Sequence, residues 1–136
     1  MKKQHWQQAL VTTMQSLEGA RFKWGVNDCC TLVADAMDAQ YGSSLRQQLD
    51  YRGERGATEF IQQRGGDIAA CLSHYLIEKN PAFVQRGDAV TFEGENGMTA
   101  GIYWVVGVWA TSPEGARLFS DVKITGAWGG PRCHQQ

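Results

Sequence analysis

The stretch that decides the fold spans residues 24–35 and has the sequence Trp24-Gly25-Val26-Asn27-Asp28-Cys29-Cys30-Thr31-Leu32-Val33-Ala34-Asp35. Asp28 is a good helix N-cap, and the apolar residues that follow it recur at helical spacing. The pattern therefore predicts a loop that ends at Asp28 and a helix that begins with Cys29. A cysteine in the first turn of a helix faces unpaired backbone N–H groups and the positive end of the helix dipole. Both favour the thiolate, so Cys29 is a candidate nucleophile.

The composition indicates one folded domain and gives no sign of a partner that carries a strong charge. The 136 residues are 43% hydrophobic and carry a net charge of −1. We expect a single domain over residues 1–136, with residues 131–136 as a mobile tail. No charge block indicates nucleic-acid binding, and no apolar run is long enough for a membrane span. Protein partners are therefore favoured over nucleic acid.

The four cysteines do not form a metal-binding pattern. Cys29 and Cys30 are adjacent, which makes a poor zinc pair, and Cys71 and Cys133 stand alone in the sequence. We therefore expect neither a metal site nor another cofactor. Cys30 and Cys71 are predicted to be small buried core residues.

Helical patterns fill the first half of the chain and strand patterns the second. Helices are predicted at residues 6–17, 28–41, 57–63 and 67–76, and strands at residues 88–92, 100–105, 107–111, 116–119 and 122–128. Because helices and strands do not alternate, the order predicts an α+β fold. In such a fold the N-terminal helices pack on one face of a C-terminal antiparallel sheet.

Three motifs in this order resemble the NlpC-type cell-wall cysteine peptidases, small papain-like domains that cut peptide bonds in peptidoglycan. Asp28-Cys29 resembles their nucleophile motif. Residues 86–92 resemble their Gly-Asp-containing strand, and residues 100–103 resemble the strand that follows their catalytic histidine. The resemblance implies an NlpC-like fold in which Cys29 occupies the nucleophile position.

The sequence is also similar to a subgroup found in phage and prophage tail gene clusters, whose function is poorly defined. The shared positions are Phe22, Trp24, Gly25, Asn27, Asp28, Cys29, Cys30, Ala34, Asp35, Leu45, Arg46, Tyr51, Ala57, Gly65, Gly66, Arg86, Gly87, Asp88, Ala127 and Trp128. This resemblance implies a protein of the virion tail, present in the host cytoplasm during assembly, whose partners are other tail-tip or hub proteins. Among the shared positions we expect structural roles for Trp24, Gly25, Asp28, Gly87 and Asp88.

The chain departs from the peptidase pattern at the catalytic histidine. The position that matches this histidine is Thr99, and Thr111 is nearest to the third catalytic position. Threonine takes up no proton near neutral pH, whereas a Cys–His catalyst needs an imidazole to hold the thiolate and protonate the leaving amine. The three histidines, His5, His74 and His134, lie elsewhere in the sequence. Cys29 would then be a nucleophile position without its base.

Three functions remain open at this point. The favoured hypothesis is a structural or assembly component of a phage tail tip, a pseudoenzyme with a degenerate cysteine-peptidase centre. The first alternative is an active peptidoglycan hydrolase that aids DNA entry. The second is thiol-dependent acyl transfer through Cys29, which would require a small-molecule cleft and a thiol of lowered pKa.

The tryptophans divide into expected core and expected contact residues. Trp6, Trp24 and Trp104 are predicted to belong to the core. Trp109 and Trp128 are predicted to contact other proteins, because tryptophan is enriched in the energetically important part of interfaces.

Overall fold

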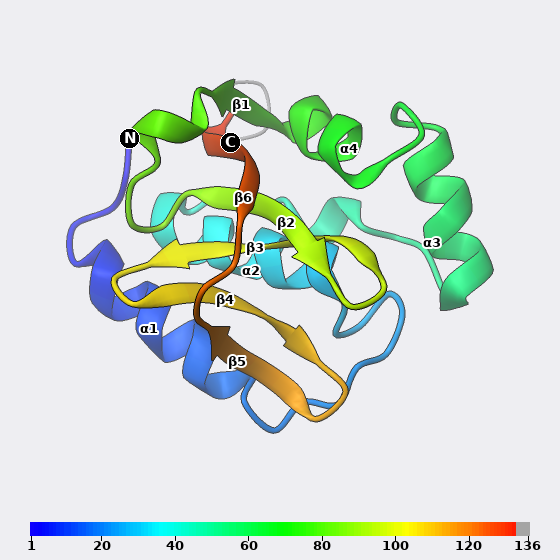
Figure 1. Ribbon diagram of the computed structural model, residues 1–136, viewed down its shortest axis with the longest axis horizontal. Helices are drawn as coiled ribbons and strands as arrows, with labels where there is room; N and C mark the ends of the chain where they lie inside the picture. Colours follow the sequence, from blue (N-terminus) through cyan, green and yellow to red (C-terminus); the bar gives the residue numbers. More distant parts are fainter. Residues whose placement is uncertain (133–136) are drawn as a thin grey trace.

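Helices occupy the first half of the chain and strands the second, as the sequence predicts (Figure 1). The computed structural model describes residues 1–132. Its elements are α1 (Trp6–Ser16), α2 (Cys29–Tyr41), η1 (Arg46–Gln48), α3 (Gly53–Gln62), α4 (Ile68–Tyr75), β1 (Leu76–Lys79), η2 (Pro81–Phe83), β2 (Ala89–Gly94), β3 (Gly97–Trp104), β4 (Gly107–Ser112), β5 (Gly115–Phe119) and β6 (Ile124–Pro131). The predicted α+β class is confirmed.

The strands form one six-stranded sheet in the order β1-β6-β2-β3-β4-β5. Every neighbouring pair in it is antiparallel. β2 to β5 follow one another as hairpins, whereas β6 returns to pair with both β2 and β1. Strands that follow one another without intervening helices are joined by short connections, and short connections favour antiparallel pairing.

The two faces of the sheet belong to separate apolar clusters. Figure 1 shows α1 and α2 on one face, where α2 contacts β3, β4 and β6. On this inner face Ile102 and Trp128 join the buried helix residues in one core. Strand residues of the opposite parity, including Val108 and Ala127, point to the outer face and form a smaller cluster. This division follows from the alternation of side chains along a strand.

α3 and β1 differ most clearly from the sequence expectation. α3 begins at Gly53, four residues before the predicted start at Ala57 (57 − 53 = 4). β1 was not expected at all, because Leu76 was assigned to the preceding helix. Leu76 pairs with Pro131 of β6, so the strand exists through a contact with a segment far away in the sequence.

The first two residues of the predicted C-terminal tail have contacts with β1 and α4. β6 continues through Pro131, and Arg132 donates from its backbone N–H to the Tyr75 carbonyl and from Nε to the Ser73 carbonyl. Residues 131 and 132 are therefore held against α4. The remainder of the predicted tail, with Cys133 and His134, lies outside the described residues.

The tryptophan assignment also needs correction. Trp128 is 1% exposed and its Nε1–H donates to Ser73 Oγ at 2.9 Å, so it is a core residue. Trp24, predicted to be buried, is 36% exposed. Trp6, Trp104 and Trp109 are partly buried against the inner core. Over residues 1–132, no helix combines the length and apolar character needed to cross a membrane.

Candidate functional site

Cys29 is the first residue of α2, as predicted, and its position is set by a complete capping box. Asp28 Oδ1 accepts from the Thr31 N–H at 2.9 Å, and Thr31 Oγ1 accepts from the Asp28 N–H at 2.8 Å. Each side chain thus satisfies a backbone donor that the start of a helix leaves unpaired. The prediction that Asp28 acts as a cap is confirmed.

The second carboxylate oxygen of Asp28 joins two loops, the one that precedes Cys29 and the one that precedes α3. Oδ2 accepts from the Gly25 N–H at 2.8 Å and from the Tyr51 hydroxyl at 2.6 Å. Asp28 is 1% exposed, so these bonds compensate for burying a carboxylate. Gly25 has a φ of 82°, and a Cβ there would collide with the Tyr51 carbonyl. Glycine is therefore required at this position.

Cys29 lies in a cleft of ≈ 420 Å³ between the helices and the sheet. The cleft is lined by Phe22, Trp24, Asp28, Cys29, Cys30, Tyr51, Ala57, Ile61, Ile68, Asn96, Met98, Thr99, Thr111, Ser112 and Pro113. Most of these side chains are apolar. The rings of Phe22 and Trp24 meet edge to face, with their centroids 4.9 Å apart, and form an exposed aromatic wall. A cleft of this size and lining suits a small ligand or the end of a chain.

The pKa of the Cys29 thiol is lowered, chiefly because the Cys30 thiol donates a hydrogen bond to it. Burial acts in the opposite direction, and the nearby charge of Asp28 also raises this pKa. A backbone hydrogen bond from Ala100 lowers it further. The thiolate is therefore stabilised by a thiol and by backbone N–H groups rather than by a cation.

The Ala100 amide can reach Cys29 because β3 and β4 separate at this point. Their paired residues begin at Ile102 and Trp109, so Ala100 has no partner on β4. On the other side of β3, the Tyr103 N–H donates to the Asp88 carbonyl, so Tyr103 directs its backbone groups toward β2. Backbone groups alternate in direction along a strand, so those of Ala100 point into the space where β3 and β4 separate, beside Cys29.

Thr99 and Thr111 line the cleft, but they lie on opposite faces of the sheet. Thr99 pairs with Phe92 of the outer cluster, without a register shift between β2 and β3. Thr111 pairs with Ala116, which belongs to the inner core that contains α2. The two threonines therefore cannot cooperate as a base and its orienting partner at Cys29. A histidine introduced at residue 99 would also point away from the inner face.

Neither His5 nor His74 lines the cleft. His5 precedes α1 in a left-handed conformation, with a φ of 62°. His74 lies on α4, where its ring packs edge to face against Tyr75 at 4.8 Å between centroids. Across residues 1–132, the cleft lining contains no imidazole, and no group of three or more His, Cys, Asp and Glu side chains is placed to hold a metal ion.

Gly87 and Asp88 form a turn that is not part of the cleft lining. Asp88 accepts from Lys79 Nζ and from the Gln85 N–H, each at 2.8 Å. Gly87 has a φ of 92°, and a Cβ there would collide with the buried Gln40 side chain. Gln40 Nε2 in turn donates to the Gly87 carbonyl at 2.9 Å. The motif thus joins the end of α2 to the start of β2.

Residues 1–129 match the family model described as a domain of unknown function, DUF6950. The protein belongs to the DUF6950 family. No curated protein is similar enough in sequence to match it.

Three features of this DUF6950 site were not found from the sequence. Tyr51 lies outside every predicted helix and strand, yet its hydroxyl donates to Asp28. The Ala100 amide depends on strand pairing, which no local pattern specifies. The hydrogen-bonded thiols of Cys29, Cys30 and Cys71 come from two helices. The predicted burial of Cys30 and Cys71 was the one sequence signal that pointed toward them.

Proposed function

We propose that this protein is an NlpC-like, papain-like domain that has kept the cysteine and the cleft of a peptidase but acts as a non-hydrolytic component of a phage tail tip. The tail setting, the tail partners and the virion location follow from the resemblance of the sequence. The fold supports the proposal, because a helix that starts with Cys29 packs on an antiparallel sheet. That is the order of elements which the peptidase resemblance implies.

The absence of an imidazole from the described cleft lining carries the non-hydrolytic part of the proposal. Amide hydrolysis through a thiolate needs a proton donor for the leaving amine. The neighbouring groups that shift the pKa of Cys29 are the Cys30 thiol, the Ala100 backbone and Asp28, and none of them is an imidazole. Asp28 Oδ1 and Oδ2 are engaged by Thr31, Gly25 and Tyr51, so this carboxyl is a structural anchor.

Partner contacts would use the strand-rich half of the chain, through residues other than Trp128. Val105 and Val106 form the two-residue turn between β3 and β4 and are 62% and 68% exposed. Such turns favour Asn and Gly, so two exposed β-branched residues there have no local structural advantage. Phe83 in η2 is 70% exposed. These three side chains are the best candidates for contacts with another tail protein.

The test of the tail role is the composition of purified tails and assembly intermediates. We expect the protein in these particles, and we expect Val105→Ser/Val106→Asn to reduce its incorporation without changing its stability. Thr58→Ser on exposed α3 is the matched surface control. Absence of the protein from all particles, together with normal tails after its deletion, would contradict the role.

Thiol-dependent acyl transfer is a second candidate, favoured by the lowered pKa of Cys29 and by the ≈ 420 Å³ cleft. A thiolate can displace a thiol from a thioester without an external acid, because a thiolate is a good leaving group. Incubation with a small acyl thioester would then add one acyl group to Cys29. The tryptic peptide covering residues 24–46 should carry the added mass, and Cys29→Ala should abolish it.

A further inference from the structure

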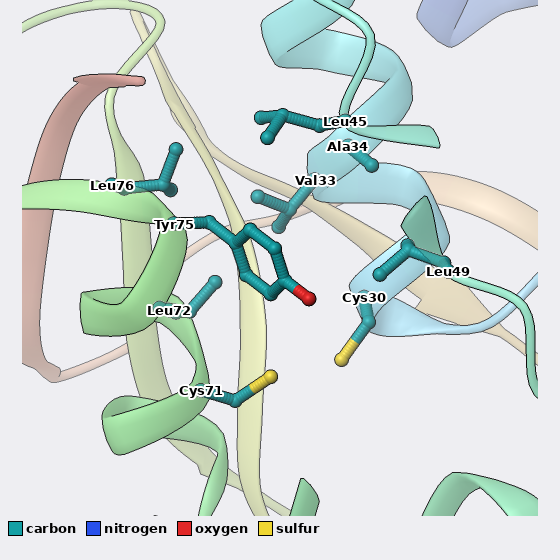
Figure 2. A pocket seen from close by; sticks show the side chains of 9 residues that line it. All are labelled: Cys30, Val33, Ala34, Leu45, Leu49, Cys71, Leu72, Tyr75 and Leu76. Atoms are coloured by element: carbon teal, nitrogen blue, oxygen red, sulfur yellow. The ribbon is translucent and has the colours of Figure 1, made fainter. Parts of the chain in front are cut away.

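Three cysteines from two helices form a hydrogen-bonded series in the interior. Cys29 and Cys30 begin α2, and Cys71 lies on α4. The Cys30 thiol interacts with Cys29 on one side and with Cys71 on the other. Figure 2 shows the Cys30 and Cys71 side chains extending toward each other, each with its sulfur at the facing end. All three thiols are free in the structure.

The surroundings of Cys30 and Cys71 leave room for their sulfur atoms to move. The pair borders a small apolar hollow of ≈ 30 Å³ that is also lined by Val33, Ala34, Leu45, Leu49, Leu72, Tyr75 and Leu76 (Figure 2). Cys30 is 9% exposed and Cys71 is 3% exposed. The volume of the hollow is on the scale of a very small molecule such as water or hydrogen peroxide.

We propose that Cys30 and Cys71 are a redox-active pair, which hydrogen peroxide converts into a disulfide linking α2 to α4. Forming the bond requires the two sulfur atoms to approach to about 2 Å. The two side chains already extend toward each other from α2 and α4, so the approach begins from facing sulfur atoms.

The reaction balances with one peroxide molecule. The Cys71 thiolate attacks one peroxide oxygen, the O–O bond breaks, and a sulfenic acid forms while the departing hydroxide takes up a proton to become water. The Cys30 sulfur then attacks the Cys71 sulfur, loses its proton and displaces the hydroxyl group as a second water. Two thiols and one peroxide thus become one disulfide and two waters.

Cys71 is the better first nucleophile of the pair. Its interaction with the Cys30 thiol lowers the pKa of Cys71 in spite of burial, and the charge of Arg64 acts in the same direction. Cys30 has its pKa raised by its two thiol neighbours and by burial. Cys71 is accordingly oxidised first, and Cys30 resolves the sulfenic acid.

Disulfide formation would also change the cleft. The Cys30 thiol proton is the largest cause of the lowered pKa of Cys29. A disulfide has no such proton, so oxidation would raise the pKa of Cys29 and slow its reaction with alkylating agents. Oxidation of the pair would in this way control the cleft thiol, because Cys30 lines both the hollow and the cleft.

Peptide mapping after peroxide treatment tests the proposal. Trypsin places Cys29 and Cys30 in residues 24–46, Cys71 in residues 65–79 and Cys133 in residues 133–136. The full-length protein is treated with hydrogen peroxide, the remaining thiols are blocked, and the digest is analysed by mass spectrometry. We expect residues 24–46 to be linked to residues 65–79, and a reductant to release them. We also expect alkylation of Cys29 to slow several-fold while the link is present.

Single-cysteine variants assign the bond. The Cys29→Ala protein should still form the link, whereas Cys30→Ala and Cys71→Ala should not. Circular dichroism establishes that each variant is folded, and Cys30→Ser replaces Cys30→Ala if the latter is not. The proposal is overturned if the folded wild-type protein forms no link between these peptides. It is equally overturned if the link persists without Cys30 or requires Cys29.

Discussion

The Tyr51 hydroxyl donates a 2.6 Å hydrogen bond to Oδ2 of Asp28, the residue that caps α2 immediately before Cys29. This bond joins the loop before α3 to the start of α2. Burial, together with the neighbouring thiols and the Asp28 carboxylate, raises the pKa of Tyr51, so its hydroxyl stays protonated as a donor. The position of the cleft thiol therefore depends on Tyr51, which lies 23 positions beyond Asp28 in the sequence.

Tyr51→Phe is expected to lower the free energy of unfolding by about 1–3 kcal/mol, because it removes a donor from a buried carboxylate. Urea denaturation measures the change. Tyr103→Phe, at a half-buried tyrosine on β3, is the matched control and should have a smaller effect. Equal stability of Tyr51→Phe and wild type would show that this hydrogen bond does not hold the loop.

Asp28→Ala is expected to cost at least about 2 kcal/mol of unfolding free energy, since it removes the cap and leaves other donors without their acceptor. Asp67 provides the comparison within the same chain. It caps α4 through a single bond to the Ala70 N–H at 2.7 Å and is exposed. Asp67→Ala should cost only about 1 kcal/mol. The same denaturation curves would contradict this ranking if Asp67→Ala were the more harmful change.

The alkylation of Cys29 should have a midpoint pH below the value of about 8.5 that is usual for a cysteine thiol. The pKa of Cys29 is lowered, so its thiolate persists to lower pH than that of an ordinary thiol. Cys30→Ala removes the strongest cause of this shift and should move the midpoint upward. Rates of iodoacetamide labelling against pH, followed on residues 24–46, measure both midpoints. Labelling of Cys71 at the same rate as Cys29 would argue against a thiol exposed in a cleft.

Trp128→Phe should destabilise the protein by about 2 kcal/mol, because it removes the hydrogen bond to Ser73 and leaves space in the core. Trp24→Phe, at a residue that is 36% exposed, should cost less than about 1 kcal/mol. Thermal unfolding of the two variants checks the difference. A larger loss of stability in Trp24→Phe than in Trp128→Phe would contradict the account of Trp128 as a hydrogen-bonded core residue.

The start of α2 could be predicted because its causes are local: Asp28 caps the helix, and the apolar residues after Cys29 follow the helical period. The start of α3 could not, because the glycines at residues 53 and 56 disfavour a helix, and the buried residues of α3 begin only at Ala57. The face occupied by Thr99 depends on the register of β3 against β2, which is a contact between distant residues. Whether a tryptophan such as Trp128 is buried likewise follows from β6 pairing with β1 and β2, not from its neighbours in sequence.

The most direct test of the central claim is the hydrolysis of peptidoglycan stem peptides by the purified protein, followed by mass spectrometry of the released fragments. Cys29→Ala is the matched variant, and an active cell-wall peptidase is the positive control. With no imidazole in the described cleft lining, we predict no sustained turnover by either wild type or Cys29→Ala. Repeated turnover by the wild type that disappears in Cys29→Ala would contradict the non-hydrolytic account.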